Sequence, residues 1–166
     1  CFAPAHLSTT LSEAVPLSLT TYESSGQTVH PDVIRGHGSA AGWWLAITPY
    51  PNGNSAMENP SIYHSRNLVD WMVPAGEPAP VERPLAGGYY SDPDIVWGDD
   101  HQLWMFYREV NHGENIINLV RSADGVQWDA PSELIRVPSH EIVSPSVVRG
   151  APDAPWQMWS VNSGPM

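Results

Sequence analysis

The sequence predicts an all-β protein made of repeated units, each holding four short antiparallel strands, which is the plan of a β-propeller blade. Two features predict it: a Pro-centred motif occurs three times in the 166 residues, and an aromatic-rich run follows each copy. The composition agrees, because 17 Pro oppose a helical bundle and 8 Trp oppose a disordered chain.

The Pro-centred motif starts each unit. It occurs at residues 30–34 (HPDVI), 92–96 (DPDIV) and 144–148 (SPSVV), and the aromatic runs follow at 43–47, 103–107 and 156–159. The three prolines are 62 and 52 residues apart, which suits one blade per repeat. We therefore expect each motif to begin the innermost strand of a blade.

A second motif closes the first two units. Ser65 to Trp71 and Ser122 to Trp128 share the pattern Ser-x-(Asn/Asp)-x-Val-x-Trp. Asn and Asp favour tight turns because their side chains bond to nearby backbone, and Trp supplies a large apolar cover. The pattern predicts a turn before the fourth strand of each unit.

The strands follow from short β-prone runs bounded by Pro, Gly, Asn and Asp. We expect them at 33–34, 43–47, 61–64 and 71–72 in the first unit, and at 94–97, 103–107, 117–121 and around Trp128 in the second. This divides the chain into an N-terminal segment with a candidate closing strand (1–27), a first blade (28–87), a second blade (88–138) and the start of a third (139–166). A closed propeller needs at least four blades, so the remaining ones are expected from a longer chain or from partner subunits.

Charge and hydropathy narrow the range of partners. The net charge is −11 and all seven basic residues are Arg, so the chain lacks the clustered positive charge that nucleic-acid binding requires. No apolar run approaches the length of a membrane span. Neutral or cationic ligands, with carbohydrate foremost, are the expected partners.

The propeller geometry gathers polar residues at one end of the axis. The starts of the inner strands would bring together His30 with Asp32, Asp92 with Asp94, and Ser144 with Ser146, with Glu141 just before the last pair. The second strands and their loops would add further polar side chains to the same funnel, namely Thr48, Tyr50, Glu58, Arg108 and Glu109. Several carboxylates on one axis are what glycoside hydrolysis needs, although Pro-Asp sequences are also common turn chemistry.

The motifs around residues 30–33, 89–96, 103–109 and 122–128 resemble those of five-bladed β-propeller glycoside hydrolases of the arabinanase, β-xylosidase and fructosidase type. Residues 47–51 and 58–62 are similar to a less characterised branch of these propellers that also occurs in bacteriophage structural proteins. The resemblance implies a five-bladed propeller, of which this chain covers two blades and part of a third.

The resemblance also implies roles for the carboxylates. Asp32 would be the general base and Asp92 the residue that tunes the acid, with Asp94 as the competing choice. The third-blade position that matches the general acid is Ser144, so the acid would be Glu141, three residues earlier. Sugar-binding roles would fall to other axial residues, namely His30, Tyr50, Glu58, Tyr89, Arg108 and Glu109. No cofactor is implied beyond a structural Ca²⁺ near the axis.

Two functions follow as hypotheses. The first is recognition, with hydrolysis by the axial carboxylates, of an extracellular or cell-surface polysaccharide. The alternative is a non-catalytic structural or adhesin module of a virion, appendage or surface layer, and both place the protein outside the cell or on a surface. Two free carboxyls roughly 5–10 Å apart would favour the enzyme, and carboxylates paired with Arg would favour the module.

Overall fold

The computed structural model describes residues 16–36, 41–77, 79–138, 140–151 and 154–164. The first sheet is four-stranded and antiparallel, in the order β1-β2-β3-β4. Its strands are β1 (Thr28–Gly36), β2 (Gly42–Pro49), β3 (Ser61–Ser65) and β4 (Trp71–Met72). Two short 3-10 turns, η2 (Pro51–Gly53) and η3 (Ser55–Met57), connect β2 to β3.

The second sheet repeats this plan and a smaller sheet begins it again. The order β5-β6-β7-β8 comprises β5 (Gly88–Trp97), β6 (Leu103–Asn111), β7 (Glu114–Ser122) and β8 (Ser132–Pro138). A two-stranded antiparallel sheet pairs β9 (Val143–Val148) with β10 (Gln157–Val161). The all-β, four-strand antiparallel organisation predicted from the repeats is confirmed.

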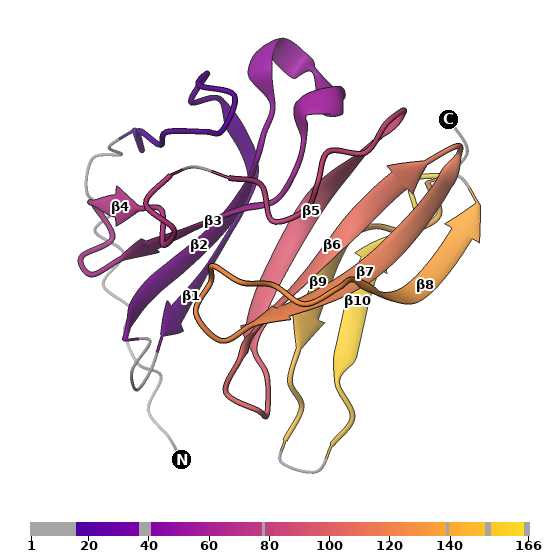
Figure 1. Ribbon diagram of the computed structural model, residues 1–166. Helices are drawn as coiled ribbons and strands as arrows, with labels where there is room; N and C mark the ends of the chain where they lie inside the picture. Colours follow the sequence, from indigo (N-terminus) through magenta and orange to yellow (C-terminus); the bar gives the residue numbers. More distant parts are fainter. Residues whose placement is uncertain (1–15, 37–40, 78, 139, 152–153, 165–166) are drawn as a thin grey trace, which may run out of the picture.

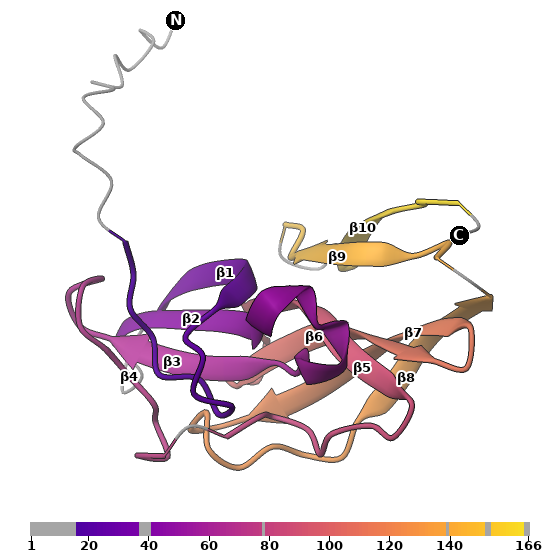
Figure 2. The same cartoon turned by 90° about the horizontal axis from the view of Figure 1, so that it is seen from above.

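The three sheets lie side by side in chain order. Figure 1 shows the indigo-to-magenta first sheet beside the pink-to-orange second sheet, and the yellow third sheet along the other face of the second. The view from above separates the third sheet from the second as a distinct layer (Figure 2). The first strands are neighbours, since β5 contacts β1 on one side and β9 on the other.

The predicted Ser-x-(Asn/Asp) turn forms in both large sheets with the same hydrogen bonds. Ser65 Oγ accepts from Leu68 N at 2.9 Å, and Ser122 Oγ accepts from Gly125 N at 2.8 Å. The Asn67 and Asp124 side chains each accept two further backbone N–H groups beyond the turn. Local side-chain bonds therefore build this turn, which is why a short sequence pattern reveals it.

The fourth strand of the second sheet lies later than predicted. The prediction placed it around Trp128, whereas β8 starts at Ser132. Asp129 bonds back to Arg121 through its backbone N–H at 3.0 Å and its carboxylate at 2.6 Å, which extends the turn. Trp128 packs against the core between the first two sheets instead of entering a strand.

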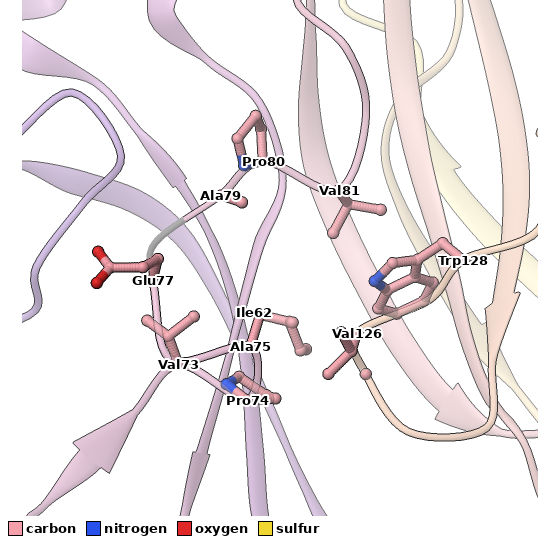
Figure 3. Close-up of a pocket in the computed structure, with 11 residues that line it drawn as sticks. Ile62, Val73, Pro74, Ala75, Glu77, Ala79, Pro80, Val81, Val126 and Trp128 are labelled. Atoms are coloured by element: carbon pink, nitrogen blue, oxygen red, sulfur yellow. The ribbon is translucent and has the colours of Figure 1, made fainter.

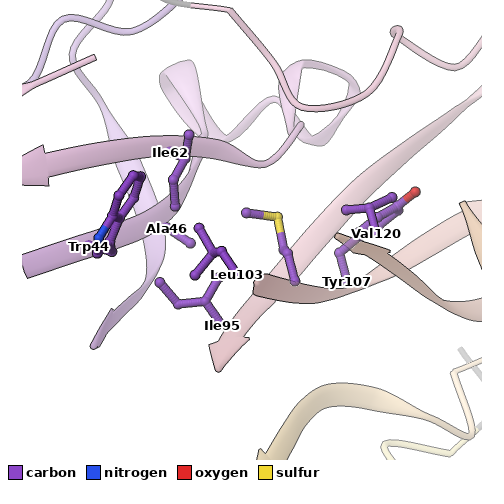
Figure 4. Packing of buried hydrophobic residues seen from close by; sticks show 8 residues of the cluster. Trp44, Ala46, Ile62, Ile95, Leu103, Tyr107 and Val120 are labelled. Carbon is purple, nitrogen blue, oxygen red and sulfur yellow. The ribbon is translucent and has the colours of Figure 1, made fainter. Parts of the chain in front are cut away.

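The main core lies between the first and second sheets. Figure 4 shows its side chains converging from β2 and β3 on one side and from β5 and β6 on the other. Leu103, Met105 and Val120 are almost fully buried there. The complete cluster is Trp44, Ala46, Ile62, Ile95, Leu103, Met105, Tyr107 and Val120. A smaller cluster of Phe106, Leu119 and Val147 joins the second sheet to the third.

Residues 16–27 form no strand. Leu19 is buried against Leu45, Ile47 and Tyr63 on the face of the first sheet that points away from the second. The Tyr63 hydroxyl donates to Thr20 O at 2.9 Å and holds the segment there. The predicted closing strand therefore does not form within 16–27, and residues 1–15 lie outside the described part of the chain.

In the described part of the chain, no helix has the length and apolarity to cross a membrane.

Candidate functional site

The residue before each motif proline adopts the same unusual backbone. His30, Asp92 and Ser144 have φ values of 53°, 51° and 50°, in the left-handed region that non-glycine residues seldom enter. Each lies where the pairing of the first and second strands shifts register. Such bulged, strained residues are often found at functional sites. Their recurrence supports the equivalence of the three motifs.

The three motifs line one cavity of about 280 Å³. The repeated motifs predicted that these side chains meet, and the structure brings them together. Asp92 and Asp94 both line the cavity, so their positions do not favour one over the other as a site residue. The lining consists of His30, Pro31, Asp32, Asp92, Pro93, Asp94, Ser144, Pro145 and Ser146.

Asp32 and Asp94 occupy equivalent positions and connect successive sheets. Asp32 Oδ2 accepts from Ile95 N at 2.7 Å, and Asp94 Oδ2 accepts from Val147 N at 2.9 Å. Burial raises the pKa of Asp32, although bonds from Ile95 N and Val33 N oppose the shift. Burial, together with the Asp32 charge, raises the pKa of Asp94 to about 7. Asp94 therefore titrates near neutrality.

The Asp94 shift predicts how stability depends on pH. Its folded pKa of about 7 exceeds its ordinary value of 3.8, so the folded state binds the proton more tightly than the unfolded state. The free energy of unfolding should fall as pH rises from about 4 to about 7. Asp94→Asn should flatten this slope in urea titrations, and the exposed control Asp70→Asn should not. An unchanged slope in Asp94→Asn would contradict the assignment.

Asp92 is buried and saturated with partners. Its Oδ2 lies 2.9 Å from Arg108 Nε and accepts from Ser144 N at 3.0 Å. Its Oδ1 lies 3.1 Å from His30 Nε2. Arg108 is itself held by Ser91 Oγ, at 3.1 Å from Nε and 2.8 Å from Nη2. This carboxylate is thus an anchor between all three sheets. Ser91 was not predicted as a site residue, because a serine inside a strand carries no sequence signal of this role.

His30 stands at the mouth of the cavity between two carboxylates. Its Nδ1 lies 3.1 Å from Thr48 Oγ1 and 3.4 Å from Glu58 Oε2. A hydrogen bond to Glu58 raises the pKa of His30, and the charges of Asp92 and Glu58 raise it further, against burial and Arg108. Its side chain is 39% exposed and lines the cavity, so a ligand bound there can reach it.

Four other predicted site residues do not line the cavity. Tyr89 lies near this network, with the Arg108 guanidinium carbon 5.8 Å from its ring centroid. Tyr50 is half-buried where β2 ends, and its backbone N–H donates to Gln27 O at 2.8 Å. Glu109 follows Arg108 in β6 and accepts from the Asn111 and Asn118 amides on the opposite face. Glu141 is exposed before β9 and does not line the cavity.

No group of three or more His, Cys, Asp or Glu side chains among the described residues is arranged to hold a metal ion. A second hollow, of about 130 Å³, lies at the outer rim between the first two sheets. Figure 3 shows Trp128 and Val126 on one side of it and Ile62, Val73 and Pro74 on the other. None of the predicted site residues lines it.

The chain is similar to a protein of Flavonifractor plautii named A type blood N-acetyl-alpha-D-galactosamine deacetylase. The two are 32% identical over 123 residues, which are 67% of this chain and 16% of the relative. This chain thus spans about a sixth of the relative's length. No protein-family model and no solved structure matches the chain.

This similarity corrects the predicted function. The relative is named for removing an acetyl group from an amino sugar, whereas the sequence analysis expected cleavage of a glycosidic bond. The prediction of glycoside hydrolysis by Asp32 and Asp92 or Asp94, with Glu141 as the acid, was therefore wrong. The pairing of Asp92 with Arg108 also removes Asp92 as a free carboxyl of the kind that a glycosidase uses. The remaining support for carbohydrate chemistry is the similarity to a relative named for an activity on an amino sugar.

Proposed function

We propose that this chain belongs to a carbohydrate-processing enzyme that removes the acetyl group from N-acetylated amino sugars. The observation that carries the proposal is one cavity lined both by a histidine whose pKa is raised by neighbouring carboxylates and by a carboxyl whose pKa is raised to about 7. Amide hydrolysis needs such an acid and such a base together. The named activity of the relative supplies the substrate class.

The architecture we propose for it is a five-bladed β-propeller, with the three sheets as consecutive blades. Three features support this: the first strands are neighbours, their motifs share one strained backbone, and their side chains line one cavity. The remaining blades would surround the same axis.

In the proposed reaction Asp94, ionised above pH 7, acts as the general base and takes a proton from a water molecule. The oxygen of that water attacks the acetyl carbonyl carbon. The His30 imidazolium stabilises the charge that develops on the carbonyl oxygen. It then gives its proton to the sugar nitrogen as the carbon–nitrogen bond breaks. The products are acetic acid, which ionises to acetate, and the amino sugar, whose amine takes up that proton. The proton held by Asp94 returns to His30 through solvent.

Removal of the imidazole tests this proposal. His30→Asn keeps a side chain that tolerates left-handed backbone but cannot carry the proton, so kcat should fall by about 100-fold or more. The assay is acetate release by the full-length protein from an oligosaccharide ending in N-acetyl-α-D-galactosamine. His112→Asn is the matched control, because His112 is exposed and also left-handed, with φ 48°. A wild-type protein that releases no acetate would refute the proposed activity.

A further inference from the structure

The environment of His30 Nδ1 contains a polar relay that the proposed reaction leaves unexplained. Thr48 Oγ1 lies 3.1 Å from Nδ1 and donates its own proton to Glu58 Oε2 at 3.4 Å. A hydroxyl that donates to a carboxylate presents its lone pairs to the third group. With the Thr48 proton on Glu58, Nδ1 carries the hydrogen in this contact. Thr48 and Glu58 are both buried, which makes an unsatisfied hydroxyl or carboxylate there costly.

Two carboxylates compete for the single proton of a neutral His30. Asp92 faces Nε2 at 3.1 Å, but its charge is already balanced by Arg108 Nε at 2.9 Å and by the Ser144 N–H. Glu58 has no cationic partner except His30 among the ion pairs of the described residues. The stronger attraction for a proton is therefore on the Nδ1 side.

Glu58 is also held in place from the second sheet. Its carbonyl oxygen accepts from Tyr90 N at 3.3 Å, and it follows the turn η3, whose cap is made by Asn54. Thr48 is the second-last residue of β2 and is fully buried. The relay is thus built on elements that packing fixes, as is required of groups that orient a catalytic side chain.

We infer that Thr48 and Glu58 are positioning residues that keep a hydrogen on His30 Nδ1, so that Nε2, which faces Asp92, is the nitrogen that gains and loses a proton. This deepens the proposed function, and its catalytic consequence rests on that function: the proton that His30 gives up is the one that Nε2 shares with Asp92. The charged groups that face His30 are Glu58, Asp92 and Arg108.

The test is the ¹⁵N NMR spectrum of the His30 ring in the full-length protein across a pH titration. Neutral wild-type His30 should be in the Nδ1–H form, and the Nε2–H form would overturn the inference. This measurement needs neither a variant nor a substrate. The inference can therefore be confirmed even if no deacetylase activity is found. It can also be overturned while that activity is present.

Two variants sharpen the test. Glu58→Gln keeps the shape but removes the charge, so the midpoint of the His30 titration should move down by about one pH unit. The double variant Thr48→Val with Glu58→Met removes both acceptors and should convert neutral His30 to the Nε2–H form. The exposed control Glu77→Gln should change neither. An unmoved midpoint in a folded Glu58→Gln protein would overturn the relay.

The same variants give a kinetic readout that a purely structural role would not. In Glu58→Gln the alkaline limb of the kcat profile should shift to lower pH by the same interval as the His30 midpoint, with KM unchanged. A uniform loss of kcat without a shift of the limb would assign Glu58 to stability alone.

Discussion

Replacing Arg108 with Met should lower the free energy of unfolding by about 3–5 kcal/mol, because it removes the buried cation paired with Asp92. The partly exposed His30 and the Ser144 N–H would be the remaining partners of this carboxylate. Both side chains are nearly inaccessible, at 10% and 4% exposure, and their atoms lie 2.9 Å apart. The loss also frees Ser91 Oγ, which accepts two hydrogen bonds from the guanidinium. Urea denaturation followed by Trp fluorescence measures the change.

The matched control for this prediction is Arg149→Met, which breaks an exposed ion pair with Asp99. A pair of that kind is worth about 0–1 kcal/mol. The double variant Asp92→Asn with Arg108→Met should recover part of the loss, since it removes the uncompensated charge. A loss below about 1 kcal/mol in Arg108→Met would mean that solvent reaches Asp92 and that the three-sheet anchor is weak.

Replacing Trp44 with Ala should have an effect of similar size, about 3–5 kcal/mol, through loss of packing between the first two sheets. Trp44 is buried in the main core, with its ring 6.3 Å from the ring of Trp97 and 4.9 Å from that of His64. A Cβ added at Gly125 would lie 2.4 Å from this ring, which shows how closely the turn of the second sheet sits on it. Thermal unfolding measures the change.

Trp159→Ala is the control for size and chemistry, because Trp159 is 56% exposed on β10. Its removal should change the free energy of unfolding by less than about 0.5 kcal/mol. If both Trp variants lose the same amount of stability, the core between the first two sheets is not the main source of cohesion.

The sequence was sufficient where the determining interactions are local. The Ser-x-(Asn/Asp) turns use side-chain bonds to backbone two or three residues away, so their pattern predicted them correctly. The short aromatic runs predicted β2 and β6, because the strand preference of aromatic residues is also a local property. The missed start of β8 shows the limit, because the Asp129 contact with Arg121 that delays it spans eight residues.

The chemistry of the site was less predictable because it depends on partners far along the chain. The sequence predicted that Asp92 meets the other motifs but could not pair it with Arg108, Ser144 and His30, which come from three different sheets. The predicted general base Asp32 bonds to Ile95, 63 residues away. A pKa depends on burial and on neighbouring charge, and neither is present in a linear motif.

What the sequence determined by itself is the repeat: three Pro-centred motifs, the four-strand antiparallel units that follow the first two, and the meeting of the motifs' polar residues in one cavity. What only the tertiary structure decided is which of those residues are free to react. Asp92 is paired with an arginine, whereas Asp94 has a pKa raised to about 7 and His30 has a pKa raised by its carboxylate neighbours. The physical reason is that strand formation and turns depend on neighbours in sequence, while charge, burial and proton affinity depend on neighbours in space.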